Sequence, residues 1–113
     1  MTPPLTITVE DAATGPVLRV DGELDYATSA QLRDLLPTLT VGPGQRLVVD
    51  LAGMHFCDSS GIAALIAARN HAQACGADIA LAAVPENTLR ILRIVGLDQV
   101  FRLHPDAGTA TGS

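Results

Sequence analysis

The sequence predicts a single α/β domain built on a mixed sheet of four or five strands, with three to four helices packed on it. The length of 113 residues suits one domain with a modest core. The second half of the chain alternates apolar, strand-like runs with helix-like segments, which is typical of parallel strands joined by right-handed crossovers. The first twenty residues predict a β-hairpin, so the sheet is expected to be mixed.

The hairpin is predicted from two short patterns. Residues 5–9 alternate apolar and polar side chains with period two, as a half-buried strand does. Residues 17–21 form a second such run, and residues 11–16 contain the Gly and Pro of a turn. Residues 1–4 are expected to be a flexible N-terminus, and the domain is expected to span residues 5–104.

A helix is predicted after the hairpin because four leucines recur with the spacing of one helical face. They are Leu32, Leu35, Leu36 and Leu39. Thr28 and Gln31 have the spacing of a capping box at the start of this helix. Pro37 is expected to end or kink it.

The most continuous apolar run, residues 46–51, predicts the most central strand. The segment after Ser60 is rich in small alanines and predicts a helix that lies close to the sheet and extends to about Cys75. Gly76 stands where the residue after a helix C-terminus is commonly glycine.

The last third of the chain predicts one more strand–helix–strand unit. A strand is expected at residues 79–84, and a helix from Glu86 that turns Leu89, Leu92 and Val95 inward and ends at Gly96. Residues 100–103 are expected to form a short last strand. Residues 105–113 are small and polar and are expected to be a flexible tail without a contribution to the core.

The strongest candidate for a functional site is Asp58-Ser59-Ser60-Gly61, between the central strand and the following helix. An Asp here suits a helix N-cap, and hydroxyls in the first turn lie where a negative charge is well tolerated. Glu23 and Asp25 follow another strand end, and sites in open α/β sheets gather at the carboxyl ends of strands.

Composition excludes several function classes. A net charge of −5 and an aromatic content of 3% argue against nucleic acid as a partner. The two cysteines lack CxxC spacing and the three histidines show no ligand spacing, so neither a metal nor another cofactor is expected. No leader and no run near eighteen apolar residues is seen, so no membrane association and a cytoplasmic location are expected.

Three motifs, in their order and spacing, resemble the STAS domains, and among them the anti-sigma factor antagonists of bacterial partner-switching systems. The first is Gly22-Glu23-Leu24-Asp25 before the first helix. The second is the strand of residues 48–51 leading to Phe56-Cys57-Asp58-Ser59-Ser60-Gly61-Ile62, and the third is the segment of residues 85–97. The resemblance covers residues 5–104.

The resemblance implies a switch rather than an enzyme. The unphosphorylated antagonist binds an anti-sigma factor that is also a serine kinase of the GHKL type, which frees a sigma factor. The kinase then phosphorylates and releases the antagonist, and a PP2C-type phosphatase restores it. By the resemblance, the acceptor is Ser59, and the partner-binding residues are Glu23, Asp25, Asp58, Ser60 and Gly61. The chain is expected to be a monomer and to lack catalytic residues.

Some alternatives stay open on the sequence alone. A helical wheel favours Ser60 over Ser59 as the exposed hydroxyl. Asp25 is equally an ordinary loop or capping residue. Cys57 is expected to be a packing residue, with a thiol pKa that the neighbouring Asp58 raises. The alternative function is a STAS subunit of a phospholipid-trafficking ABC transporter, which binds its ATPase without phosphorylation.

Overall fold

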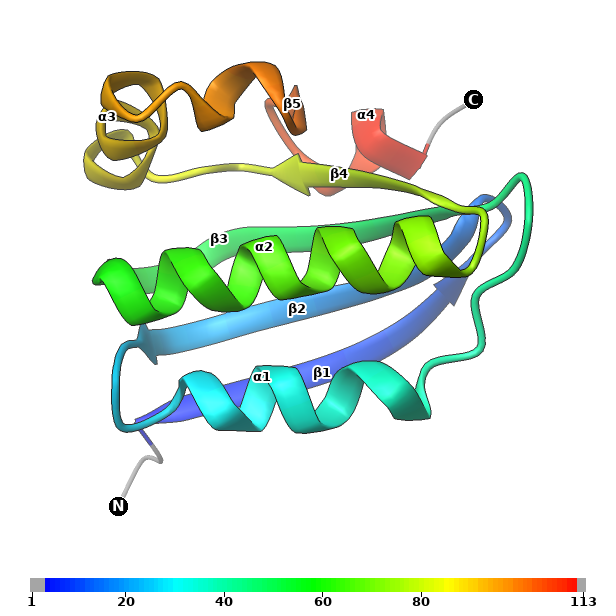
Figure 1. The fold of residues 1–113 in the computed structure, drawn as a ribbon, viewed down its shortest axis with the longest axis horizontal. Coiled ribbons are helices and arrows are strands. Elements are labelled where there is room, and N and C mark those ends of the chain that lie inside the picture. The colour runs from blue at the N-terminus through cyan, green and yellow to red at the C-terminus, as the bar shows by residue number, and fades with distance from the viewer. Residues whose placement is uncertain (1–3, 112–113) are drawn as a thin grey trace.

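The computed structural model describes residues 4–111, which form one five-stranded sheet with helices packed on both of its faces (Figure 1). The strands are β1 (Leu5–Ala12), β2 (Gly15–Leu24), β3 (Arg46–Cys57), β4 (Asp78–Ala82) and β5 (Arg102–His104). The helices are α1 (Ser29–Leu35), α2 (Ser59–Ala74), α3 (Glu86–Ile94) and α4 (Ala107–Thr111), and two 3₁₀ turns cover Leu36–Thr38 and Leu97–Gln99.

The strands lie in sequence order across the sheet, β1-β2-β3-β4-β5. β1 and β2 form an antiparallel hairpin in which Ala12 pairs with Gly15, so its loop has two residues. β2, β3, β4 and β5 run parallel to one another. The predicted mixed α/β sheet that opens with a hairpin is confirmed, and β3 is its central strand, as expected.

The main core lies between one face of the sheet and helices α1, α2 and α3. It is built almost entirely from Leu, Val, Ile and Ala, because few aromatic side chains are available. The alanines of α2 that face the sheet have no exposed surface and allow the close helix–sheet approach that was predicted; they are Ala64, Ala68 and Ala72. Leu32 and Leu36 anchor the α1 segment in this core.

The second face of the sheet carries a smaller core under α4. Ala110 is fully buried there and packs with Val17, Val48, Ala80 and Ala82. The guanidinium of Arg46 donates to the carbonyl of Ala110 at 3.0 Å and fixes the helix to β3. The prediction that the segment from residue 105 contributes nothing to the core is therefore wrong for α4.

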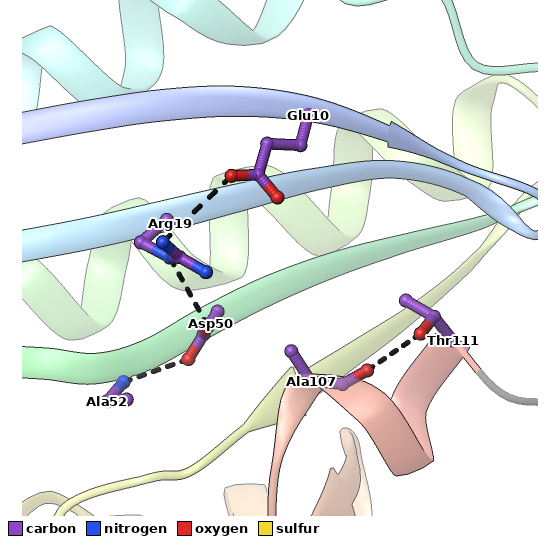
Figure 2. Close-up of polar contacts among 6 residues, drawn as sticks. All are labelled: Glu10, Arg19, Asp50, Ala52, Ala107 and Thr111. Atoms are coloured by element: carbon purple, nitrogen blue, oxygen red, sulfur yellow. Dashed lines mark hydrogen bonds and ion pairs between the residues drawn. The ribbon is translucent and has the colours of Figure 1, made fainter.

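A polar cluster occupies the same face beside α4 (Figure 2). Asp50 on β3 is only 6% exposed, and its carboxylate lies 3.7 Å from Nε of Arg19 on β2. The other carboxylate oxygen accepts the N–H of Ala52 at 3.0 Å. Arg19 also lies 3.9 Å from the carboxylate of Glu10. The buried charge of Asp50 is thus compensated by one cation and one backbone donor.

Several local predictions can be compared with the structure. Pro37 does end α1, because the chain tightens into a 3₁₀ turn at Leu36. Gly76 and Gly96 follow their helices with φ of 75° and 80°, the left-handed conformation that favours glycine. Val95 was expected to point inward, but it is 58% exposed because α3 ends at Ile94, one residue earlier.

The start of α1 also differs from the prediction. Thr28 is the N-cap residue but makes no side-chain capping bond, so the capping box with Gln31 is wrong. Its hydroxyl instead donates to the carbonyl of Glu23 at 2.6 Å.

The flexible N-terminus predicted for residues 1–4 falls mostly on residues 1–3, outside the described residues. Pro4 is described, and its carbonyl accepts the N–H of Glu23 at 2.8 Å. Among the helices of residues 4–111, none has the length and apolar character needed to cross a membrane.

Candidate functional site

The two segments that the sequence singles out lie side by side at one edge of the sheet. β2 and β3 are parallel neighbours, and Leu24 pairs with Cys57 at their carboxyl ends. The loop after β2 and the start of α2 therefore emerge next to each other. A hydrogen bond of 3.3 Å from the N–H of Asp58 to the carbonyl of Leu24 joins them.

Asp58 is the N-cap of α2, as predicted. One carboxylate oxygen accepts the N–H of Gly61 at 3.0 Å, and the backbone carbonyl of Asp58 accepts the N–H of Ile62. The other carboxylate oxygen accepts the N–H of Tyr26 from the β2–α1 loop at 3.1 Å. A single side chain thus caps the helix and holds the adjacent loop.

The β2–α1 loop is stabilised from within by Asp25. Its Oδ1 accepts the N–H groups of Ala27 and Thr28 at 3.0 and 3.1 Å, and its own N–H donates to the Thr28 hydroxyl. These bonds make Asp25 a loop-forming residue, the alternative that the sequence left open for it. Glu23 is exposed at the end of β2 and presents its carboxylate to solvent.

The first two residues of α2 differ in exposure. Ser59 is exposed, and Ser60 is half-buried. The helical wheel favoured Ser60 and is wrong here. Ser59 is the first helical residue, and its surroundings are set by the turn from β3 rather than by the face of α2 that packs on the sheet. As the first residue of α2, Ser59 lies at the capped amino end of the helix, where backbone N–H groups point outward.

Gly61 allows α2 to begin against the end of β2. A Cβ at this position would lie 2.3 Å from the carbonyl oxygen of Leu24 and 2.6 Å from Sγ of Cys57. Any side chain would push α2 away from the sheet. Because Gly61 is buried, it is not accessible to a partner, and its role is to set the position of Ser59 at the start of α2.

Cys57, directly before the N-cap, is buried, as the packing role predicted for it requires. Burial raises the pKa of the Cys57 thiol to about 12, and the negative charge of Asp58 adds to the rise. The predicted direction of the pKa shift is confirmed. The thiol stays protonated at neutral pH and is unsuited to nucleophilic chemistry.

Two exposed aromatic side chains flank this edge, and the sequence interpretation assigned neither of them a role. Tyr26 is 85% exposed at the tip of the β2–α1 loop, and Phe56 is 53% exposed near the end of β3. The available signal was the scarcity of aromatic residues, since the chain has only three. A tyrosine inside the loop motif is unlike the small and acidic residues around it.

The arrangement presents the exposed Ser59 directly after the helix N-cap Asp58. Both carboxylate oxygens of Asp58 accept backbone N–H groups, which leaves it poorly placed as a base for Ser59. Within the described residues 4–111, no group of three His, Cys, Asp or Glu side chains is arranged to hold a metal ion. A phosphoryl group on Ser59 would lie at a helix N-terminus, where its charge is favourable to the fold.

Comparison with known proteins gives consistent matches along nearly the whole chain. Residues 7–105 match the family model described as "Mlab, STAS domain". A STAS-domain containing protein of Pseudomonas aeruginosa is 31% identical over 101 residues, covering 88% of this chain and 99% of that protein. The anti-sigma-F factor antagonist RsfB of Mycobacterium tuberculosis is also 31% identical, over 88% of this chain and 80% of its own length. The crystal structure of an anti-sigma factor antagonist from Mycobacterium paratuberculosis superposes with a TM-score of 0.78 and 27% identity, and all of both chains is covered.

Proposed function

The chain belongs to the STAS domain family, and on that premise we propose that it is an anti-sigma factor antagonist controlled by phosphorylation of Ser59. In the unphosphorylated state it binds an anti-sigma factor and frees a sigma factor. The exposed hydroxyl of Ser59, directly after the N-cap Asp58, is the observation that carries this proposal. A bacterial cytoplasm, where ATP and the transcription machinery are present, is the proposed location.

The proposed partner is also the kinase, an ATP-dependent enzyme of the GHKL type. The oxygen of Ser59 attacks the γ-phosphorus of ATP, the bond from that phosphorus to the β-phosphate oxygen breaks, and a basic group of the kinase takes up the hydroxyl proton. The products are phosphoserine and ADP. A PP2C-type phosphatase reverses the switch, because water cleaves the phosphoserine ester to serine and inorganic phosphate.

The position of Ser59 supports a change in binding rather than in folding. Phosphate adds about −1.5 to −2 charges. At the amino end of α2 this charge is tolerated by the fold, because outward N–H groups and the helix dipole favour it. In the complex, the same phosphate would lie next to the carboxylate of Asp58 and would be enclosed by the partner surface that covers Ser59. Repulsion and the desolvation of like charges would then weaken the complex.

The test is phosphorylation of the purified protein by the candidate anti-sigma kinases of the same genome, with ATP. Intact mass and phosphopeptide analysis should find one added phosphate at Ser59, absent in Ser59→Ala. The phosphorylated protein should bind the kinase at least tenfold more weakly than the unmodified one. Ser60→Ala tests the assignment of the site, because it should still gain one phosphate at Ser59.

The same experiment separates the alternative function. A STAS subunit of a phospholipid-trafficking ABC transporter would capture the transporter ATPase and remain unmodified by every kinase. The matched family model takes its description from Mlab and not from an antagonist, so family membership alone does not choose between the two functions. Phosphorylation at Ser60 would keep the proposed function but move the switch by one residue.

A further inference from the structure

Two of the three aromatic side chains of the chain lie exposed at the edge of the sheet that carries Ser59. Tyr26 and Phe56 are 85% and 53% exposed, whereas Phe101 is buried. Aromatic rings bring the largest apolar area per residue to an interface and are enriched among the residues that dominate binding energy. Their position at this edge makes it a candidate contact surface for a partner.

Tyr26 is presented on a loop whose backbone is already fixed. Its N–H is held by the carboxylate of Asp58, and the next two N–H groups are held by the carboxylate of Asp25. The ring therefore projects into solvent from a backbone with little freedom to lose. A pre-organised anchor of this kind lowers the entropic cost of association.

The surface on the other side of Ser59 is hollowed. A cavity of about 190 Å³ lies between the end of β3 and the start of α3, and its lining includes Phe56, Pro85 and Ile91. The cavity lies between the last residues of β3 and the segment that follows β4, whereas the Tyr26 loop follows β2. Because β2, β3 and β4 are neighbours in that order, the loop and the cavity lie on either side of the Ser59 junction. The edge thus combines one projecting ring with one recess able to receive a partner side chain.

The charge of the Tyr26 loop indicates the character of the partner. Residues 22–28 contain Glu23 and Asp25 and no basic residue, and Glu23 is exposed. A complementary surface would place Lys or Arg side chains around an apolar pocket. An apolar centre surrounded by a polar rim is the usual composition of a specific protein–protein interface.

We propose that Tyr26 is the principal anchor of the partner interface, and that the anti-sigma factor receives its ring in an apolar pocket bordered by basic side chains. This inference rests on the proposed function and adds to it the anchoring residue and the chemistry of the binding surface. Glu23 contributes at the rim, and Phe56 borders the recess that takes a side chain of the partner.

The first test uses a label rather than a mutation. Tyr26 is the only tyrosine of the chain, so incorporation of 3-fluorotyrosine gives a single ¹⁹F signal that reports on this ring alone. In the free protein, the signal should shift between H₂O and D₂O, because the ring is exposed. On addition of the anti-sigma kinase that the phosphorylation experiment identifies, the signal should move and its solvent isotope shift should fall by at least half.

The second test is affinity measured by calorimetry. Tyr26→Ala should weaken binding of the same kinase by at least 30-fold, and Tyr26→Phe by less than fivefold. Stopped-flow mixing should show that Glu23→Gln lowers the association rate and reduces the dependence of that rate on salt. Val9→Ala is the control: Val9 is 44% exposed on β1 toward the hairpin, away from this edge, and its variant should bind within twofold of the natural protein.

The outcomes distinguish this inference from the proposed function. Suppose that the kinase phosphorylates Ser59 but binds Tyr26→Ala as tightly as the natural protein, or leaves the ¹⁹F signal solvent-exposed. Tyr26 is then not the anchor of the interface, whereas the proposed function is still supported. If no anti-sigma kinase binds the natural protein, both proposals fail. Unchanged thermal unfolding of Tyr26→Ala, expected from the exposure of its ring, would assign the lost affinity to the interface.

Discussion

Asp58 accepts the backbone N–H of Tyr26 at 3.1 Å across 32 residues of sequence. The same carboxylate caps α2 through the N–H of Gly61. One side chain therefore sets both the start of the helix that carries Ser59 and the conformation of the neighbouring loop. The positions of Ser59 and Tyr26 relative to one another depend on this carboxylate.

Asp58→Ala should destabilise the fold by about 2 kcal/mol, because the cap of α2 and the bond to the Tyr26 loop are lost together. Asp58→Asn should lower the free energy of unfolding by less than half as much as Asp58→Ala. The amide oxygen of the asparagine still caps the helix, and only the bond to the N–H of Tyr26 is lost. Urea unfolding followed by circular dichroism measures both. Equal losses in the two variants would mean that the helix cap contributes little.

Gly61→Ala should destabilise the protein by about 1–3 kcal/mol, because the new methyl group would overlap the carbonyl of Leu24 and the sulfur of Cys57. Gly42→Ala is the matched control. At Gly42 the nearest atom to an added Cβ is the side-chain oxygen of Gln45 at 3.9 Å, so the substitution should change stability by less than about 0.5 kcal/mol. Thermal unfolding of both variants makes the comparison.

The sequence predicted this site because local signals and topology agree there. Asp58 has the residue type of an N-cap, and it follows the most continuous apolar strand. Parallel pairing of β2 and β3 then brings the Glu23–Asp25 loop to the same edge without any further information. The order of exposure of Ser59 and Ser60 could not be read from a helical wheel, because it is set by the turn from β3 into α2.

Features that depend on tertiary contacts were missed. The bond from Tyr26 to Asp58 joins two loops that are distant in sequence and has no periodic signal. α4 was predicted as tail because two alanines among small polar residues resemble a linker, yet Ala110 fits against small residues of the sheet. The capping box at Thr28 failed because Asp25 and Glu23 offer its hydroxyl closer partners.

Arg19→Met should destabilise the protein by about 1–3 kcal/mol, because Asp50 is buried and would keep only the N–H of Ala52 as a partner. Half of the Arg19 side chain is exposed, which keeps the loss at the lower end of that range. Glu10→Gln removes the more exposed and more distant carboxylate and should change stability by less than about 0.5 kcal/mol. Equal effects of the two substitutions in urea unfolding would contradict this assignment.

Ala110→Asp should detach α4 from the sheet, because an unpaired carboxylate would be placed in a fully buried apolar contact with Val48 and Ala80. Hydrogen exchange should then increase at α4 and at the strands beneath it, while α2 keeps its protection. Thr109→Asp adds the same charge at an exposed position of the helix and loses only the bond from the Thr109 hydroxyl to the carbonyl of Asp106, so it should increase exchange far less than Ala110→Asp. Unaltered protection in Ala110→Asp would show that α4 does not protect this face.

Stability should fall at alkaline pH because of Cys57. The folded state holds its thiol proton to a pKa of about 12, whereas an unfolded cysteine releases it near 9. The stabilisation from this group is therefore fully present below about pH 9 and is lost as the pH rises toward 12, by at most about 1.4 kcal/mol per pH unit. Between pH 8 and 10, the free energy of unfolding should fall by about 1 kcal/mol more in the natural protein than in Cys57→Ala, because partial solvent access to the thiol weakens the effect. A thiol reagent at pH 8 should modify the partly exposed Cys75 first and reach Cys57 only after unfolding. Rapid modification of Cys57 in the folded protein, or parallel pH profiles for the two proteins, would show that the thiol is neither buried nor held protonated by its surroundings.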